Sequence, residues 1–316
     1  MRRVAARVHL WGGLVTGPLL LVLGLSGSAL VFGPEIEQAL DGPPAITTAA
    51  TPSPSLDAVV AAAVVGHPGA EPRALRLPAR PEQPYRVELA VGGRRLDVAV
   101  DPSTLRVVGA RAPERSLLVA VRSLHAALHA GRAGALLVAL LGVWLVVEGA
   151  TGLWLYGASV TRRPRVPGRA VHRVVGACSL AVGAIVGLTG AMLALEAAVA
   201  VASPPVSAAG LARLDFAAAR TQTHGRLIAL VAEAGHRVRL HERLPNGRRV
   251  ATVVDRDTGE IVGARGESAR DPWDVVRGLH GGAFAGWPSR LVYAVVGLAL
   301  PVLSITGFLI STRRRA

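Results

Sequence analysis

Four apolar stretches dominate the sequence, and each is long enough to cross a lipid bilayer. They cover roughly residues 10–32, 135–156, 174–195 and 291–310. A helix needs about 20 apolar residues to cross a hydrocarbon core of about 30 Å. A soluble protein of this length would be more polar than this chain, which is 51% hydrophobic over 316 residues, and its apolar residues would be less clustered. The sequence therefore predicts an integral membrane protein with four transmembrane helices.

Arginines flank these stretches and set the predicted orientation. They lie at both termini and between the second and third stretches: Arg2, Arg3, Arg7, Arg162, Arg163, Arg165, Arg169, Arg313, Arg314 and Arg315. Short basic flanks favour the cytoplasmic side, so we expect both termini and the 158–171 loop in the cytoplasm. Residues 33–130 and 197–286 then face the opposite side. Because the net charge of +14 is explained by these flanks, it does not indicate nucleic-acid binding.

Cys178 is the only cysteine, and it lies within the third apolar stretch. A single cysteine excludes an intrachain disulfide within this sequence, a CxxCH haem attachment and a cysteine-ligated cluster. We interpret it as a small core residue.

The two outer segments contain polar regions with strand-like alternation. Residues 85–89 and 96–100 form one predicted strand pair, and residues 237–240 and 250–254 form another. Gly92-Gly93 and Asn246-Gly247 mark the hairpin turns. An apolar pattern that we interpret as helical precedes each pair, at 56–66 and 227–234. We expect one small α+β domain in each segment.

The two halves of the chain resemble each other almost without gaps. Gly93-Arg94-Arg95 recurs as Gly247-Arg248-Arg249 at an offset of 154, and the Arg122-x-Leu124-His125 motif recurs at an offset of 155. In the first and third apolar stretches the offset is 163. Each half starts in the cytoplasm, so the pattern predicts two parallel repeats rather than inverted ones.

Four histidines recur in this repeat, one before each predicted helix. His9 and His172 enter from the cytoplasmic side, whereas His125 and His280 enter from the far side. Two such pairs suit bis-histidine ligation of one or two b-type haems, because neutral imidazole is a good iron ligand and a four-helix bundle can hold a macrocycle. The alternative is that these histidines cap helices or face lipid headgroups, since duplication repeats a residue whatever its role.

Two further residues break the symmetry of the repeat. His129, with Phe284 as its counterpart, lies one helical turn from His125 and is a substitute ligand. Glu148, with Leu303 as its counterpart, lies in the middle of the second predicted helix. An ionisable group at that depth is costly, so Glu148 is a candidate proton or polar site, or a protonated and merely satisfied group.

One geometric difficulty concerns the outer histidines. His125 precedes Leu136 by eleven residues, about 16 Å along a straight helix, which would hold two haems too far apart for fast electron transfer. Chain breaks at Gly131–Gly134 and at Pro288 would fold both histidine segments back over the bundle.

These features resemble the PepSY-associated transmembrane family, which includes iron-regulated membrane proteins and ferric-siderophore reductases. The resemblance covers nearly the whole chain. It is carried by VHLWGGLVTG with LSG, RSLHAALHAG with ATGLWLYG, RAVHRVVG with LTG, and RGLHGGAFAGW with SITG and terminal arginines. The segments that end in VDPSTLRVVG and VDRDTGEIVG are similar to PepSY domains. The chain departs from the family at His129, where an apolar residue is usual, and after Thr306-Gly307, where the family's tryptophan-rich end is missing.

The resemblance implies a four-helix membrane protein with PepSY-like domains outside the cytoplasm. The expected organisation is a helix at 1–32, an outer segment at 33–130 with a PepSY-like domain at about 55–116, a helix at 131–157, a loop at 158–171, a helix at 172–196, an outer segment at 197–286 with a second PepSY-like domain at about 206–268, and a helix with a basic tail at 287–316. For reductase members it also implies histidine-ligated haem and one-electron reduction of ferric chelates. His9, His125, His172 and His280 match the family's recurring histidines.

The leading hypothesis is a haem-dependent electron-transfer protein of the cell membrane that reduces ferric, siderophore-like complexes outside. Since no Gly-rich dinucleotide fingerprint follows a strand, a quinol or a cytoplasmic reductase would supply the electrons. The main rival is a non-redox membrane protein that binds or regulates an envelope protease or another partner. A small transporter is a third hypothesis, based on Glu148 and the repeat alone.

Overall fold

The computed structural model describes residues 1–41, 54–78, 80, 82–112, 116–157, 168–202, 225–233, 236–245, 249–265 and 272–312. The chain divides into two compact units. The helical unit comprises Met1–Ile36, Leu117–Pro204 and Asp271–Ala316, and the sheet unit comprises Glu37–Ser116 and Pro205–Arg270.

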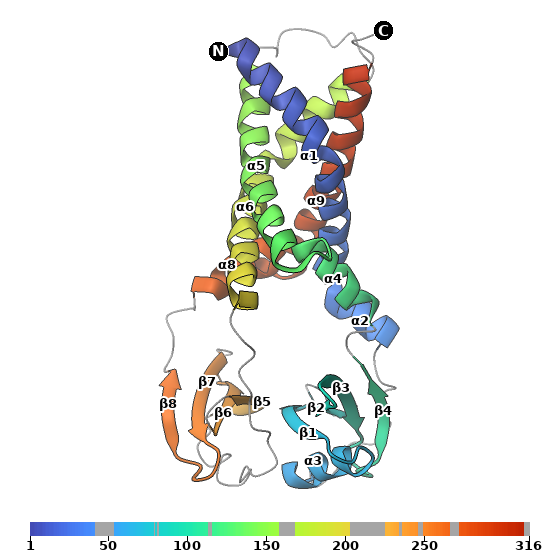
Figure 1. Ribbon diagram of the computed structural model, residues 1–316, viewed down its shortest axis with the longest axis vertical. Helices are drawn as coiled ribbons and strands as arrows, with labels where there is room; N and C mark the ends of the chain where they lie inside the picture. Colours follow the sequence, from blue (N-terminus) through green and yellow to red (C-terminus); the bar gives the residue numbers. More distant parts are fainter. Residues whose placement is uncertain are drawn as a thin grey trace. The chain divides into compact units, whose positions relative to one another are not determined.

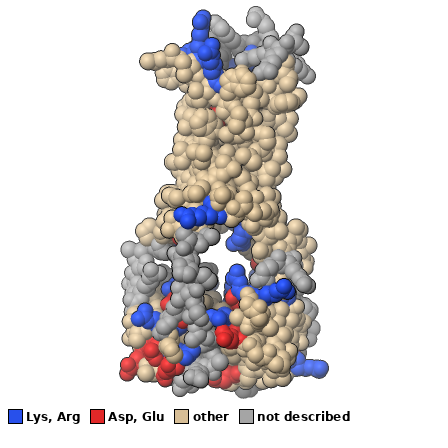
Figure 2. All heavy atoms as spheres, in the orientation of Figure 1, with Lys and Arg blue, Asp and Glu red and all other residues tan. Residues whose placement is uncertain are grey.

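Four long helices form the helical unit (Figure 1). They are α1 (Arg2–Val31), α5 (Gly131–Gly157), α6 (Arg169–Ala202) and α9 (Trp287–Thr312). All four are long and apolar enough to cross a membrane, and Figure 2 shows an outer face almost without charged side chains between the two ends of this unit. Large apolar side chains such as Leu140 and Trp154 are more than 60% exposed, which suits contact with lipid rather than water. The chain is therefore a membrane protein with four candidate spanning helices.

Glycines let these helices approach closely in two matching pairs. A Cβ on Gly24 of α1 would lie 2.5 Å from the carbonyl oxygen of Gly297 on α9, and a Cβ on Gly142 of α5 would lie 2.5 Å from that of Gly187 on α6. Small residues at such positions allow backbone contact between helices in a membrane. The α1–α9 and α5–α6 contacts thus depend on equivalent glycines in the two halves.

Two short helices precede α5 and α9 and are separated from them by sharp turns. Helix α4 (Leu117–Ala127) ends at Leu128 and His129, which both have positive φ values, and α5 begins at Gly131. Helix α8 (Pro272–Gly281) is followed by Gly282 at φ 66°, by the 3-10 turn η2 (Ala283–Ala285) and by Gly286 at φ 69°. These breaks replace the straight continuation of each helix, and they allow α4 to contact α1 and α8 to contact α6.

The described residues of the sheet unit form an antiparallel sheet of eight strands, in the order β4-β3-β2-β1-β5-β6-β7-β8. The first outer segment supplies β1 (Glu71–Arg76), β2 (Tyr85–Val91), β3 (Arg94–Val100) and β4 (Val107–Arg111), and the second supplies β5 (Arg226–Glu233), β6 (Arg237–Arg243), β7 (Arg249–Asp255) and β8 (Ile261–Arg265). Strands β1 and β5 join the two sets, with Leu75 opposite Leu230. The short helices α2 (Gly33–Asp41) and α3 (Leu56–Val65) precede β1, and α3 packs into the core of the sheet.

The sheet differs from the expectation of two small separate domains. A single core cluster includes Val59, Leu75 and Val98 from the first segment together with Leu230 and Val254 from the second. A domain of about 60 residues buries little surface alone, and pairing β1 with β5 covers an edge strand in each. Joining the two sets therefore enlarges the core and removes two open edges.

The predicted helix at 227–234 is wrong, because Arg226–Glu233 is strand β5. Its run LIALVAE has no clear period, and its two edges pair with β1 and β6. The hairpins at 85–100 and 237–254 do form, and Gly92 and Gly93 adopt the positive φ of a two-residue turn. The predicted Asn246-Gly247 turn and residues 158–167 of the predicted loop lie outside the described residues.

Candidate functional site

The four histidines meet as two pairs within the helical unit. We call His9 of α1 and His172 of α6 the terminal pair, because it lies toward the end that holds the start of α1. Its ring centroids are 6.1 Å apart. His125 of α4 and His280 of α8 form the folded-back pair, with centroids 6.0 Å apart.

All four rings are held through the same nitrogen by a repeated arrangement. Each Nδ1 lies within hydrogen-bond distance of a Ser or Thr hydroxyl on a neighbouring long helix. The four contacts are His9 with Thr151 at 3.2 Å, His172 with Thr306 at 2.9 Å, His125 with Ser26 at 3.1 Å and His280 with Thr189 at 3.3 Å. In three of them Nδ1 also lies near the backbone carbonyl three residues before that hydroxyl: Glu148 at 3.2 Å, Leu23 at 3.1 Å and Val186 at 3.2 Å.

These partners select the tautomer of the rings. A carbonyl oxygen only accepts a hydrogen bond, and each hydroxyl already donates its proton to the carbonyl of its own preceding helical turn, as Thr306 does to Val302 at 2.6 Å. Nδ1 must therefore carry the proton and donate it. The other ring nitrogen, Nε2, then holds a lone pair and is the atom available to a metal.

A glycine follows each of these hydroxyl residues and makes room for the ring. A Cβ on Gly27 would lie 2.7 Å from Cε1 of His125, and one on Gly190 would lie 2.8 Å from Cε1 of His280. The equivalent distances at Gly152 and Gly307 are 3.1 Å to His9 and 3.4 Å to His172. The Ser/Thr-Gly dipeptides of the four long helices thus form the contact sites of the four imidazoles, which we call the ring sites.

In the sequence repeat, Ser26-Gly27 matches Thr189-Gly190 and Thr151-Gly152 matches Thr306-Gly307. From the sequence alone, small residues such as Gly27 and Gly190 indicate close helix packing. The recurrence of these dipeptides once in each long helix, in the same number as the recurring histidines, was the signal that linked them. The interpretation as packing residues is too narrow, because these glycines face imidazole rings.

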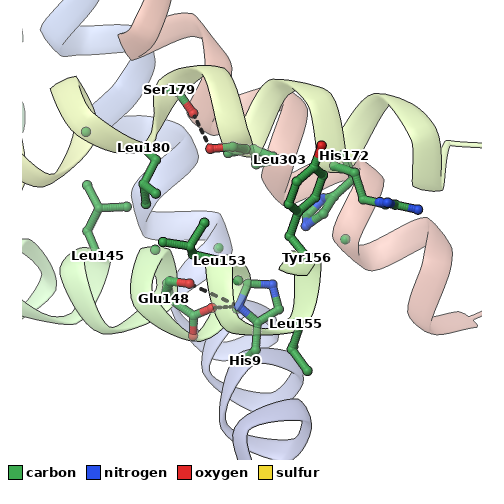
Figure 3. A pocket seen from close by; sticks show the side chains of 18 of the residues that line it. His9, Leu145, Glu148, Leu153, Leu155, Tyr156, His172, Ser179, Leu180 and Leu303 are labelled. Atoms are coloured by element: carbon green, nitrogen blue, oxygen red, sulfur yellow. Dashed lines mark hydrogen bonds and ion pairs between the residues drawn. The ribbon is translucent and has the colours of Figure 1, made fainter. Parts of the chain in front are cut away.

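A cavity of about 870 Å³ lies at the terminal pair. His9 and His172 line it, and Figure 3 shows Glu148 beside the ring of His9. Its other walls are mainly apolar and include Leu145, Leu180 and Leu303. Cofactor sites commonly have volumes of about 300–1,000 Å³ and mostly apolar walls with a few polar groups.

Four arginines also line this cavity: Arg2, Arg3, Arg169 and Arg173. The guanidinium of Arg173 lies 5.1 Å from the ring centre of Tyr156. Guanidinium groups match carboxylates in shape and charge. The cavity therefore combines an apolar wall, two imidazoles and cations that suit an acidic ligand.

Glu148 is 9% exposed and lies within reach of the terminal pair. Its Oε2 is 2.9 Å from Nδ1 of His9, and its Oε1 accepts a hydrogen bond of 3.1 Å from Nε1 of Trp144. The buried carboxylate is thus fully partnered, and its main partner is one of the candidate ligands.

His129 does not join either pair. It is exposed, has φ 57°, and its Nδ1 lies 3.1 Å from the hydroxyl of Ser123. Its backbone N–H bonds to the carbonyl of Ser123 at 3.3 Å, as at a helix C-terminus that ends in a left-handed residue. The structure thus gives His129 a place in the turn after α4.

The folded-back pair is held in a neutral state by its surroundings. Burial, together with the nearby His280, lowers the pKa of His125 to about 4. Burial also lowers the pKa of His280. Both rings are therefore uncharged at neutral pH, as metal ligation requires.

The centroid distances of both pairs fit an iron ion between the rings. Two imidazoles that bind one iron from opposite sides, each through a metal–nitrogen bond of about 2 Å, have ring centres roughly 6 Å apart. Within the described residues, no three His, Cys, Asp or Glu side chains gather as a metal cluster. The donor set is therefore two separate couples of imidazoles.

Comparison with known proteins gives the family. A search of curated proteins finds no match. The family model for the PepSY-associated TM region matches residues 6–314, which is nearly the whole chain and includes both pairs. The chain belongs to the family of the PepSY-associated transmembrane region.

Proposed function

We propose that this protein carries electrons across a cell membrane by means of two haems, one at each histidine pair, and passes them to ferric complexes outside the cell's cytoplasm. The observation that supports this most directly is the pairing of four Nδ1-anchored imidazoles at centroid distances of 6.0 and 6.1 Å. When bound in this way, haem exchanges one electron at a time. The residues of the chain would hold each iron, exclude water and set its potential.

The spacing of the pairs suits transfer across a bilayer. On α1, His9 and Ser26, the partner of His125, are seventeen residues apart, about 25 Å along a helix. One pair would thus lie near each face of a hydrocarbon core of about 30 Å. Folding α4 and α8 back against α1 and α6 supports this placement, because straight helices would carry His125 and His280 beyond the core.

The direction of transfer follows from the basic flanks. Under the positive-inside rule we propose that both termini, and therefore the terminal pair, lie at the cytoplasmic face of the inner or plasma membrane. A quinol or a cytoplasmic reductase would reduce the terminal pair's site, and an anionic ferric chelate, of siderophore type, would accept the electron outside. The reaction would make the protein a ferric-chelate oxidoreductase.

An optical spectrum of the full chain purified from haem-replete cells tests this proposal. We expect reducible bands of low-spin bis-histidine haem and two haems per chain. His9→Ala and His280→Ala should each remove one haem, and the double variant should remove both. His129→Ala, the matched control outside both pairs, should keep both.

A colourless protein from the same cells would contradict the proposal and would favour the non-redox alternative. Retention of both haems in the His9→Ala, His280→Ala double variant would contradict the assignment of the ligands. Reduction of a ferric chelate by the protein in vesicles, with quinol as the donor, would then test the acceptor.

A further inference from the structure

Glu148 makes the two halves of the helical unit chemically unequal at one point. Its repeat counterpart is Leu303, and the two residues occupy equivalent places. A Cβ on Gly13 would lie 3.7 Å from Oε2 of Glu148, and a Cβ on Gly176, the counterpart of Gly13, would lie 3.6 Å from Cδ2 of Leu303. A carboxylate beside His9 thus replaces the isobutyl group beside His172.

The carboxylate is set against the proton-bearing nitrogen of His9. Of the three oxygens near this Nδ1, Oε2 of Glu148 is the closest at 2.9 Å, whereas the Glu148 carbonyl and the Thr151 hydroxyl both lie at 3.2 Å. The acceptors described at His125 and His280 are hydroxyl and carbonyl oxygens. Hydrogen bonds from a donor to a carboxylate are shorter and stronger than those to neutral acceptors.

The surroundings fix the position of this carboxylate. Nε1 of Trp144 donates to Oε1 at 3.1 Å, so each oxygen accepts from a different N–H group. Gly12 leaves the space that these groups fill, because a Cβ there would lie 2.6 Å from the Trp144 ring and would overlap Oε1. Two donors and a fitted pocket thus hold the two oxygens of Glu148 in place.

We propose that Glu148 is a positioning residue that makes His9 the more electron-rich ligand and sets the reduction potential of the terminal pair's haem below that of the folded-back pair's haem. A carboxylate that accepts the Nδ1 proton raises the basicity of Nε2, and a more basic axial ligand stabilises the ferric form over the ferrous form. The inference rests on the proposed function, since it takes haem as the bound group.

The consequence is an energetic direction for electron transfer. With haem bound at both pairs, one electron would pass from a ferrous iron held by His9 and His172 to a ferric iron held by His125 and His280, leaving the first ferric and the second ferrous. The quinol or reductase of the proposed function resupplies the electron. The lower potential at the first site makes this step downhill from the end that holds the termini.

A redox titration of the full haem-loaded protein, followed by its absorption bands, tests the proposal. Wild type should give two midpoint potentials. Glu148→Gln keeps the shape of the side chain and removes its charge, so it should move the lower potential to a more positive value and leave the higher one unchanged. Repeating the titration in the His280→Ala background, which keeps only the terminal pair, should give the same positive shift on a single potential.

A second variant moves the same potential in the opposite direction. Trp144→Phe removes the indole donor and leaves the carboxylate and His9 in place, so more negative charge remains for His9 and the lower potential should become more negative. A merely structural role for Glu148 would not give opposite signs. Ser311→Ala is the matched control, because Ser311 does not line the cavity and its described hydrogen bond goes to the Phe308 carbonyl of its own helix.

The outcomes separate the inference from the proposed function. Unchanged potentials in Glu148→Gln, with the bis-histidine spectrum intact, would overturn the inference and leave the proposed function standing. If Glu148→Gln loses the terminal pair's haem, Trp144→Phe becomes the test. An unchanged lower potential, or a shift of that potential to a more positive value, would then overturn the inference. A wild-type protein without haem would overturn both.

Discussion

The two histidine pairs are built from the same parts but placed on different kinds of helix. The terminal pair lies on two long helices, α1 and α6, beside a cavity with four arginines and a carboxylate. The folded-back pair lies on two short helices, α4 and α8, whose positions depend on turns with positive φ. In both, a Ser or Thr hydroxyl and a glycine hold the ring. The comparison indicates that the hydroxyl and glycine contacts are common to both halves, whereas, among the described residues, a carboxylate contacts a ring of the terminal pair only.

The ring site with the shortest distance between glycine and imidazole belongs to the folded-back pair. An added methyl group at this glycine should have the largest effect. Gly27→Ala places a Cβ 2.7 Å from Cε1 of His125, and the ring cannot move away without breaking its bonds to Ser26 and Leu23. We expect loss of the folded-back pair's haem, measured by haem content and spectrum. Gly307→Ala, with 3.4 Å to His172, should have a small effect at the terminal pair.

Gly157→Ala is the control for both variants, because Gly157 ends α5, does not line the cavity, and a Cβ there meets no atom within 4 Å. It should keep full haem content. If Gly27→Ala and Gly307→Ala lost haem equally, the difference in fit between the two pairs would be refuted.

Acid should weaken the haem-free protein through the folded-back pair. The pKa of His125 falls from about 6.5 when unfolded to about 4 when folded, so the unfolded chain binds more protons between these values. The contribution of neutral His125 to the free energy of unfolding is therefore fully present above pH 6.5. It is lost as the pH falls toward 4, and the loss is about 3 kcal/mol. Thermal unfolding of the apoprotein at several pH values measures this loss.

His125→Gln is the matched variant for the acid effect. It removes the titrating ring, so its melting temperature should depend less on pH between 6.5 and 4. Identical pH profiles for His125→Gln and wild type would show that His125 is not held neutral by burial.

The hydroxyl acceptor at the terminal pair can be removed without a change of shape. Thr306→Val deletes the oxygen that lies 2.9 Å from Nδ1 of His172. Loss of such a partner typically costs roughly 10- to 100-fold in metal affinity. Haem titration of the apoprotein should show this loss at one of its two sites.

Thr312→Val on the same helix should leave both affinities unchanged, since the described hydrogen bond of Thr312 goes to the carbonyl of Leu309. If Thr306→Val bound haem as tightly as Thr312→Val, the hydroxyl would not help to hold the ring.

The arginines of the cavity should give the smallest effect. Arg173→Gln removes one cation that would pair with a haem carboxylate, and a partly exposed pair of this kind is worth about 2- to 5-fold in affinity. The effect should be confined to the terminal pair and should weaken with salt. Arg7→Gln changes a basic residue of the N-terminal flank that does not line the cavity, and it should leave haem binding unchanged. Equal losses would point to the net charge of the basic flanks instead.

Much of the helical unit could be predicted from local sequence. The four spans follow from length and apolarity, and the pairing of His9 with His172 and of His125 with His280 follows from the repeat offsets. The chain break before α5 was also predicted. The positive φ values at Leu128, His129 and Gly131 place the turn at the first residue of the predicted Gly131–Gly134 break and just before it.

The rest depends on contacts between distant residues. Strand β5 was predicted as a helix because a short apolar run has no period that separates the two structures. The β1–β5 pairing joins residues that are remote in the chain, and no local pattern encodes it. The ring sites of the histidines were missed for a related reason. Small residues in a membrane helix usually indicate helix packing, and Gly27 comes into contact with His125 only in the folded chain.

The junction of β1 with β5 also has a consequence for biosynthesis. Ribosomes make the first outer segment well before the second. Leu75 and its neighbours in β1 therefore cannot pair with β5 until Leu230 has been synthesised. During that interval β1 is an edge strand, and its unpaired amide and carbonyl groups can pair with a strand of another chain. Newly made chains stalled before residue 226 should therefore depend most on holding chaperones.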